Sequence, residues 1–247
     1  MNLSHSAGNA TTPVALITGV GRRLGHYLAL QLAAAGYRVI GSYRSERPQL
    51  AELRAAGVEL LQCDFNDNAA TIALAAQLAQ QLPRLDLLLH NASAFGPTSN
   101  GLATAAAEFE QFFRVHMLAP WLLTEALAPA LAASDNGCVV AITDIYVNHP
   151  NPALAAYCSS KAGLDSLCQS WVRRLAPKVR VNSIQPGPIL FLDEHDAAYR
   201  QQVLARTPLQ REGGLEPIAQ ALWLILNNRY LSGARIPVDG GRAVAEL

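Results

Sequence analysis

The feature that most constrains the fold is a regular alternation of short apolar runs with alanine-rich stretches of helical period. The apolar runs have strand length and almost no polar residues, which is typical of parallel strands buried on both faces. Repeated β-α units predict an α/β fold, a single Rossmann-type doubly wound parallel sheet of about seven strands with helices on both faces. We expect strands at 14–18, 38–42, 58–62, 85–90, 138–143, 179–185 and 235–238, and helices at 22–35, 49–56, 68–81, 106–133, 153–176 and 215–227.

Length and composition fit one domain with a large core. Of the 247 residues, 51% are hydrophobic and 15% are charged, against about 25% charged in an average soluble domain. The formal net charge of zero argues against a nucleic-acid partner. We interpret 1–12 as a polar N-terminal extension without a signal peptide, and 13–247 as a single domain. No apolar run approaches membrane-spanning length, so we expect no membrane association.

The cysteines and histidines show no spacing typical of a metal site. Cysteines at 63, 138, 158 and 168 lie in apolar or helical context. We therefore predict reduced core thiols in a cytoplasmic protein, and no bound metal.

A glycine-rich turn follows the first predicted strand, in the segment Thr18-Gly19-Val20-Gly21-Arg22-Arg23-Leu24-Gly25. Glycines at the first β-α junction let backbone N–H groups approach a pyrophosphate, and the helix N-terminus adds positive potential. The spacing is one residue longer than G-x-G-x-x-G, and a tight turn with no ligand is the alternative. Arg22 and Arg23 would then lie close to the phosphate charge.

The residues after the second predicted strand indicate which dinucleotide would bind. Sites for NAD usually carry an acidic residue here, which accepts from the ribose 2′-hydroxyl. This chain has Tyr43-Arg44-Ser45 instead, and an arginine beside a hydroxyl suits a 2′-phosphate. The segment favours NADPH, although Glu46 follows directly.

Tyr157 and Lys161 are four residues apart in a predicted helix, so their side chains share one face. An ammonium at this spacing would lower the pKa of the phenol and prepare it for proton transfer near neutral pH. The alternative is an ordinary surface pair.

Together these segments resemble the short-chain dehydrogenase/reductase family over nearly the whole chain. The resemblance also rests on Asp64, on Asn91-Ala92 after the fourth strand, on Pro186-Gly187-Pro188-Ile189 and on Val238-Asp239-Gly240-Gly241. It implies that Asp64 contacts adenine, that Lys161 holds the nicotinamide ribose, and that the Ile189 backbone meets the carboxamide. The full set of implied cofactor contacts is Gly19, Gly21, Arg22, Arg23, Leu24, Tyr43, Arg44, Ser45, Asp64, Phe65, Asn91, Ala92, Ser93, Tyr157, Lys161, Pro186, Gly187 and Ile189.

Three departures from the general family pattern resemble pteridine reductases. Arg23 replaces the middle glycine of the turn, and Asp144 stands thirteen residues before Tyr157, where the family usually has serine. Phe95 follows the fourth strand, at the mouth of the expected nicotinamide pocket. A narrower resemblance to bacterial dihydropterin reductases implies dihydromonapterin as substrate, with dihydrofolate as a weaker one.

The chemistry of position 144 agrees with this resemblance. A ketone reductase stabilises negative charge on oxygen, which a neutral serine does and a carboxylate opposes. A dihydropterin instead has a C=N bond whose nitrogen needs a proton, and Asp144 can accept from pterin N–H groups or pass a proton through Tyr157. Phe95 can stack on the flat ring. Arg23, Phe95, Asp144 and Tyr157 are thus the expected substrate contacts, although Asp144 can also cap a turn and Phe95 can be a packed loop aromatic.

We therefore expect an NADPH-dependent dihydropterin reductase with Asp144, Tyr157 and Lys161 as catalytic residues. A carbonyl or ketoacyl reductase and a non-catalytic NADP(H)-binding protein are the alternatives. The proton donor to pterin N5 is open between Tyr157, Asp144 and water, and His116 is open between a proton relay and a structural bond. We expect residues 186–206 to include a mobile substrate loop. The apolar surface of the helices at 106–133 and 153–176, with the resemblance, suggests a homotetramer.

Overall fold

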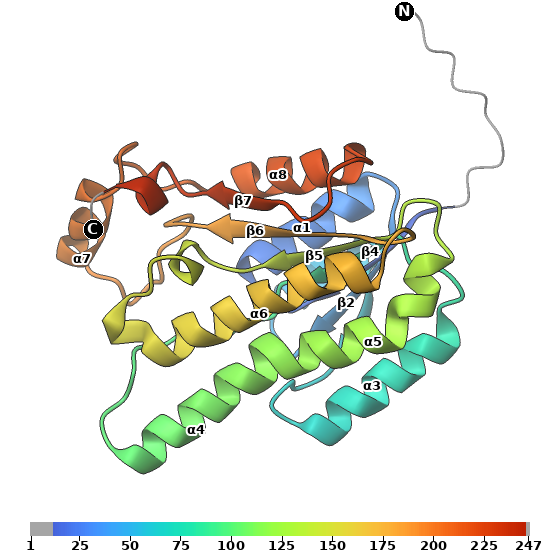
Figure 1. Cartoon of the computed structure of the whole chain (residues 1–247), viewed down its shortest axis with the longest axis horizontal. Helices are drawn as coiled ribbons and strands as arrows, with labels where there is room; N and C mark the ends of the chain where they lie inside the picture. The colour runs from blue at the N-terminus through green and yellow to red at the C-terminus, as the bar shows by residue number, and fades with distance from the viewer. Residues whose placement is uncertain (1–11, 246–247) are drawn as a thin grey trace, which may run out of the picture.

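The computed structural model describes residues 12–245, which form a parallel sheet between two layers of helices (Figure 1). The predicted N-terminal extension therefore lies outside the described residues except for Thr12, and its boundary stays a prediction. Within the described chain the sheet has seven strands in the order β3-β2-β1-β4-β5-β6-β7, which confirms the predicted α/β class. The strands are β1 (Val14–Thr18), β2 (Arg38–Tyr43), β3 (Glu59–Gln62), β4 (Leu87–His90), β5 (Cys138–Ile142), β6 (Arg180–Pro186) and β7 (Arg235–Val238).

Helices cover both faces of this sheet. On one face lie α1 (Arg23–Ala34), α2 (Leu50–Ala55) and α8 (Glu216–Asn227), and on the other lie α3 (Asn68–Gln81), α5 (Ala119–Ala132) and α6 (Ala155–Arg174). The remaining helices are α4 (Leu102–Phe113), which continues into α5, and α7 (Ala197–Ala205) near the C-terminus (Figure 1).

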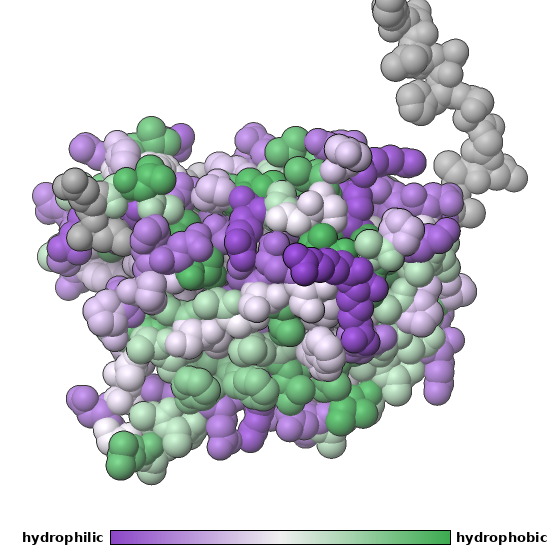
Figure 2. Space-filling view, viewed as in Figure 1, coloured by the Kyte–Doolittle hydropathy of each residue, from purple (hydrophilic) through white to green (hydrophobic). Residues whose placement is uncertain are grey.

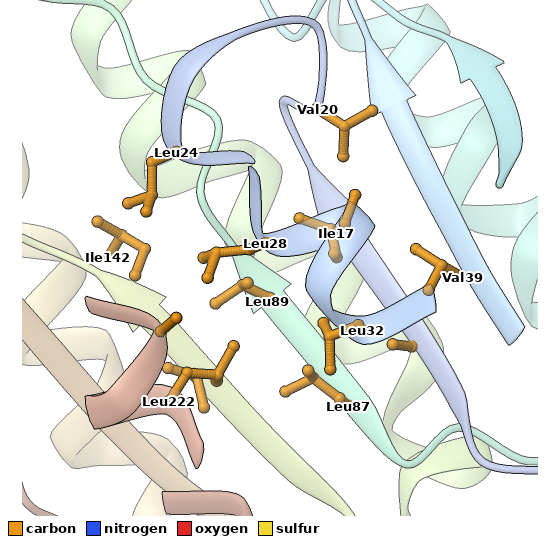
Figure 3. Close-up of a cluster of buried hydrophobic side chains, with 14 of the residues drawn as sticks. Ile17, Val20, Leu24, Leu28, Leu32, Val39, Leu87, Leu89, Ile142 and Leu222 are labelled. Atoms are coloured by element: carbon orange, nitrogen blue, oxygen red, sulfur yellow. The ribbon is translucent and has the colours of Figure 1, made fainter. Parts of the chain in front are cut away.

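There is an apolar core on each face of the sheet, and strands contribute side chains to both, because successive side chains point to opposite faces of a sheet. Along β1, Ile17 packs under α1 while Leu16 packs under the helices of the other face. Figure 3 shows the first of these cores, where α1, the central strands and α8 meet. Its labelled members are Ile17, Val20, Leu24, Leu28, Leu32, Val39, Leu87, Leu89, Ile142 and Leu222.

The sheet order reverses between β1 and β4. From β1 the chain crosses to β2 and β3 on one side, and from β4 it crosses to β5, β6 and β7 on the other. Loops that leave such a point diverge, so a ligand crevice opens outside the carboxyl ends of the strands. The turn after Thr18 and the segment after His90 both begin at this edge.

The helix predicted at 106–133 is longer than expected and is not uniform. The described chain is helical from Leu102 to Ala132, 31 residues, with a π-helical turn, η1 (Arg114–Leu118), between α4 and α5. By length and composition alone, this helix is long and apolar enough to cross a membrane. The expectation from sequence considered only unbroken apolar runs and therefore did not identify it. Half of its most apolar window is buried inside the structure, as in the core helix of a soluble protein.

The C-terminal loop region contains a helix that the sequence reading missed. Within the predicted loop at 186–206, α7 begins after Asp196, whose carboxylate accepts from the Tyr199 N–H at 2.7 Å. That N-cap was the available signal. The helix has no buried residue, so it lacks the apolar face by which the other helices were recognised.

Candidate active site

The glycine turn brings β1, α1 and the segment after β4 into close contact. Gly19 has a φ of +77°, and a Cβ there would lie 2.7 Å from Ala92 Cα. A Cβ on Gly25 would lie 2.2 Å from the Gly19 carbonyl oxygen and 2.4 Å from Asn91 Nδ2. By contrast, the nearest atom to a Cβ on Gly21 is Tyr43 Cβ at 3.8 Å. Gly19 and Gly25 are therefore required by packing, while Gly21 leaves open space beside the turn.

The two arginines of the turn have different surroundings. Arg22 is exposed at the N-cap of α1 and makes no side-chain cap, so the first-turn N–H groups face outward without a side-chain acceptor. Arg23 has a left-handed backbone conformation, with a φ of 54°, which glycine adopts more readily than arginine. Its Nη2 donates to the Leu190 carbonyl at 2.5 Å, so Arg23 links the glycine turn to the C-terminal loop.

The segment after β2 has an exposed basic residue, and its acidic residue is already paired. Arg44 and Ser45, which were predicted to bind the cofactor, are both exposed. Glu46 forms a two-point ion pair with Arg54, at 2.7 and 3.1 Å, so the acid that followed the predicted site is already paired. Arg47, which the sequence reading did not single out, lies with its Cδ about 3.9 Å from a Cβ position on Gly21.

Thr18, at the end of β1, holds the segment that follows β4. Its Oγ1 accepts from the backbone N–H of Asn91 at 2.9 Å and from that of Ala92 at 3.0 Å. Asn91 Nδ2 donates back to the carbonyls of Thr18 and Gly19. The sequence reading missed Thr18, because a threonine at a strand end is also an ordinary β-sheet residue.

Asp144 and Tyr157 meet where β5 ends and α6 begins. Tyr157 Oη donates to Asp144 Oδ2 at 2.7 Å, and Asp144 Oδ1 accepts from the Tyr146 N–H at 2.9 Å. The carboxylate therefore caps the short 3₁₀ turn η2 (Ile145–Val147) with one oxygen and reaches the phenol with the other. Asp144 therefore caps a turn, as one of the two interpretations expected, and it also contacts Tyr157, while its role in catalysis stays a prediction.

The electrostatics of this pair differ from the sequence expectation. Burial, followed by the Asp144 carboxylate, raises the pKa of the Tyr157 phenol well above its ordinary value. The expectation that Lys161 lowers this pKa is wrong for this structure. Lys161 Nζ lies 5.9 Å from the Tyr157 ring centroid and donates to the Ile142 carbonyl at 2.9 Å, whereas Asp144 touches the phenol directly.

Burial also shifts the other two ionisable groups near the phenol. It raises the pKa of the Asp144 carboxyl, against the opposing effects of the Tyr146 N–H, the Tyr157 phenol and Lys161. It lowers the pKa of the Lys161 ammonium to about 8, against the attraction of Asp144. The carboxyl thus holds a proton more readily than an ordinary aspartate, and the lysine loses one more readily than an ordinary lysine.

Phe95 lies beside Tyr157 and is half exposed. Its side chain is 49% exposed, and its ring meets the Tyr157 ring edge-on with centroids 5.0 Å apart. Phe112 packs on the same tyrosine at 6.0 Å from the inner side. The aromatic ring predicted at the mouth of the pocket is therefore beside the phenol, with its outer surface free to contact a flat ligand.

His116 joins the segment after β4 to α6. Its Nε2 lies 3.1 Å from the Ala94 N and 2.9 Å from Ser93 Oγ, and its Nδ1 lies 2.7 Å from Ser160 Oγ. Burial, followed by Lys161, lowers the pKa of this imidazole well below its ordinary value. The His116 side chain is fully buried.

Apart from Leu24, which lies on α1, the other predicted cofactor residues lie at the carboxyl ends of strands or in the segments that follow them. Gly187 lies against the residue that follows β7, because a Cβ there would be 2.6 Å from Asp239 Cβ. The Ile189 N–H donates to the Gly187 carbonyl, and the Ile189 carbonyl accepts from Gly214. The rest are Leu24 and Phe65, which are buried, Pro186, which ends β6, and Asp64, which is exposed and accepts from Asn66.

The four cysteines are free and buried, and burial raises the pKa of the Cys138 thiol to about 11. Between residues 12 and 245, no group of three or more histidine, cysteine or acidic side chains is placed to hold a metal ion.

Comparison with known proteins establishes the family. A sequence model described as enoyl-(acyl carrier protein) reductase matches residues 19–243, from the glycine turn to the last short helix. The chain belongs to the short-chain dehydrogenase/reductase family. Short-chain reductases use a nicotinamide cofactor, so the chain is an oxidoreductase of that kind.

Several curated members of this family are similar over almost their whole length. The dihydromonapterin reductase of Escherichia coli (strain K12) is 37% identical over 232 residues, which are 92% of this chain and 95% of the relative. The dihydromonapterin reductase of Enterobacter sp. (strain 638) is 35% identical over 237 residues, 95% of this chain and 98% of the relative.

Solved structures of short-chain enzymes share the fold closely. Acetoin dehydrogenase from Enterobacter cloacae superposes with a TM-score of 0.83 at 25% identity, covering 96% of this chain and 98% of its own. A putative betaketoacyl-ACP reductase superposes with a TM-score of 0.80 at 29% identity, covering 94% and 98%.

Proposed function

We propose that this protein is an NADPH-dependent dihydropterin reductase that converts 7,8-dihydromonapterin to tetrahydromonapterin and acts more weakly on dihydrofolate. The observation that carries the proposal is the 2.7 Å hydrogen bond from Tyr157 to Asp144, an acid where the family usually has an alcohol. The exposed ring of Phe95 beside this pair, and the relatives named dihydromonapterin reductase, support the same substrate class.

The residues around the glycine turn and after β2 support a dinucleotide with a 2′-phosphate. Gly21 leaves space beside the uncapped N-terminus of α1, where N–H groups and Arg22 would meet the pyrophosphate. Arg44 and Ser45 would bind the 2′-phosphate, because Glu46 is paired with Arg54 and does not compete as a ribose acceptor. Asn91 and Ala92, held by Thr18, would line the cofactor, and Lys161 would hold its nicotinamide ribose.

NADPH, when bound, supplies the hydride that C6 of the dihydropterin accepts. Phe95 holds the flat ring in the crevice by stacking, which fixes its orientation. Tyr157 keeps its proton because burial raises the pKa of its phenol, and it delivers that proton to N5 as the nitrogen becomes basic. Asp144, whose own pKa is raised, would take up a proton from solvent and return it to the Tyr157 oxygen, with the direction of their hydrogen bond reversed.

Initial rates of NADPH oxidation test the proposal directly. We would measure 7,8-dihydromonapterin, dihydrobiopterin and dihydrofolate beside acetoin and a β-ketoacyl thioester. Turnover of the dihydropterins with little ketone turnover is expected. Turnover of ketones alone would establish a carbonyl reductase and overturn the role of Asp144, and NADPH binding without any turnover would leave a cofactor-binding protein.

Exposed apolar surface supports a proposal for the quaternary structure. Large apolar side chains on α4 are exposed, with Leu102 at 92%, Phe109 at 55% and Phe113 at 42%. Figure 2 shows apolar surface over the face that carries α4, α5 and α6. We infer that copies of this chain pair through this face into a cytoplasmic homotetramer that binds neither nucleic acid nor membrane. Light scattering after size-exclusion chromatography would report the mass, and a monomer would contradict the inference.

A further inference from the structure

The segment between β4 and Phe95 is fixed at two separate points. Near β4, the N–H groups of Asn91 and Ala92 both donate to Thr18 Oγ1. Nearer Phe95, the Ala94 N–H donates to His116 Nε2 at 3.1 Å. The first attachment lies beside the glycine turn and the second beside the ring that covers Tyr157.

The bonding around His116 determines which nitrogen carries its proton. A backbone N–H can only donate, so Nε2, which accepts from Ala94, has no hydrogen. The neutral imidazole therefore carries its hydrogen on Nδ1, which donates to Ser160 Oγ at 2.7 Å. Ser160 in turn donates to the Tyr157 backbone carbonyl at 2.7 Å. The chain of bonds ends on the backbone of α6 and not on the phenol.

The π-helical turn places His116 for this task. The Ala119 N–H bonds to the Arg114 carbonyl, five residues back, so η1 contains one residue more per turn than the helices around it. The imidazole is also stacked on Phe112, with ring planes 6° apart, and meets the Tyr157 ring edge-on. Its orientation is thus set by packing on two sides as well as by hydrogen bonds.

We propose that His116 is a positioning residue that fixes Phe95 over the substrate by tying Ala94 to α6, and that it is not a proton relay. Both ring nitrogens are used by this tie, Nε2 as acceptor and Nδ1 as donor. Thr18 fixes the cofactor side of the same segment. The attachment at His116 therefore positions the substrate, and the attachment at Thr18 positions the cofactor. The substrate part of this inference rests on the proposed dihydropterin function.

Two substitutions separate the bonds of His116. In His116→Gln, the Oε1 takes the place of Nε2 and keeps an acceptor for the Ala94 N–H. In His116→Asn, the Nδ2 takes the place of Nδ1, keeps the donor to Ser160 and loses the reach to Ala94. We expect H116N to raise the dihydropterin KM about tenfold, as loss of one hydrogen bond does, and H116Q to stay within about threefold of wild type.

Thr18→Val is the matched control at the other attachment. It removes the hydroxyl at nearly constant volume, so we expect a NADPH Kd about tenfold weaker, with the dihydropterin KM changed less than about threefold. H116N should show the reverse, with NADPH affinity within about twofold of wild type. Equal effects of H116N on both ligands, or a KM unchanged in H116N, would overturn the division of roles.

Two measurements need no substrate and remain decisive if the wild-type protein reduces no dihydropterin. Histidine 15N NMR of the wild-type protein should show His116 with a hydrogen on Nδ1 and none on Nε2. The Ala94 amide should be protected from hydrogen exchange in wild type and H116Q, and should exchange at least about tenfold faster in H116N. A hydrogen on Nε2, or unchanged exchange in H116N, would refute the tie to Ala94.

Discussion

The phenol of Tyr157 donates to Oδ2 of Asp144 at 2.7 Å, while Oδ1 of the same carboxylate is held by the Tyr146 N–H. The carboxylate is therefore held at both oxygens, by a backbone N–H in the turn after β5 and by a side chain on α6. A serine in its place would have one oxygen on a shorter side chain instead of the two oxygens that make these bonds. This geometry makes position 144 the most direct test of the proposed chemistry.

Asp144→Ser should reduce dihydropterin turnover by roughly a hundredfold or more, the scale of a lost acid-base group. NADPH should still bind, because the carboxylate contacts none of the residues proposed for the phosphates. Steady-state kinetics and a NADPH titration would measure the two effects. Asp135→Ser, an exposed change of the same kind, is the control. Undiminished pterin turnover in D144S would remove the acid from the mechanism.

The pH profile of dihydropterin reduction should report Asp144. Burial raises the pKa of its carboxyl, so the protonated form persists to higher pH than in an ordinary aspartate. Because this form returns the proton, kcat/KM should fall as pH rises through the raised pKa. Tyr157 should not cause this fall in kcat/KM, because the pKa of its phenol is raised well above its ordinary value. Asp144→Asn should abolish this fall in kcat/KM. A fall that persists in the variant would have to be assigned to another group.

Arg44→Asp should discriminate between the two dinucleotides. We expect the NADPH Kd to weaken by roughly 10- to 100-fold, as for loss of a charge-assisted hydrogen bond, with little change for NADH. Arg173→Asp, on the exposed end of α6, changes the net charge equally and serves as control. Equal loss of both cofactors in R44D would remove the 2′-phosphate assignment.

Lys161 should make stability depend on pH at alkaline values. Its pKa is lowered to about 8 in the folded protein, whereas the unfolded chain titrates near 10.5. Between these values the unfolded chain binds more protons at this lysine, so Lys161 should contribute a rise in the free energy of unfolding with pH, of about 3 kcal/mol in all. Urea titrations from pH 7 to 10.5 should show this rise as the difference between wild type and Lys161→Met, because the buried thiols and Tyr157, whose pKa values are raised, contribute a fall in both proteins.

Lys178→Met is the matched control, because Lys178 is exposed. Its free energy of unfolding should follow that of wild type across this pH range. A difference between wild type and Lys161→Met that stays constant between pH 8 and 10.5 would show that Lys161 keeps its charge when buried.

Two glycines of the same turn should respond differently to alanine. A Cβ on Gly25 meets the Gly19 carbonyl oxygen at 2.2 Å, so Gly25→Ala should lower the Tm by about 5 °C through backbone displacement. Gly21→Ala meets nothing closer than 3.8 Å, and its Tm should stay within about a degree of wild type. Calorimetry would compare the variants, and equal melting would contradict the close approach at Gly25.

The sheet was predictable because strand and helix periods are local properties of the sequence. An apolar run such as 14–18 can be identified as a strand without knowing what it packs against. The order of the β-α units then limits the possible topologies. The helix α7 was missed for the same reason, since it has no apolar face and only Asp196 marks its start. The π-helical turn at His116 left no periodic signal either.

Within the site, residue types were predictable and their interactions were not. The spacing of Tyr157 and Lys161 places both on one face of α6, but it says nothing of the depth of burial or of which group lies nearer the phenol. The direction of the pKa shift of Tyr157 depends on both, and the expectation from spacing was wrong. Thr18 escaped notice because its partners, Asn91 and Ala92, are more than seventy residues away in the chain.

The concealment of all four sulfur atoms has a practical consequence for handling the protein. Cys63, Cys138, Cys158 and Cys168 are each enclosed by the folded domain, and burial raises the pKa of all four thiols. An alkylating reagent therefore finds no thiolate until a molecule opens. Counting alkyl groups by mass spectrometry during a thermal ramp would read out unfolding without a dye, a tag or an assay of activity.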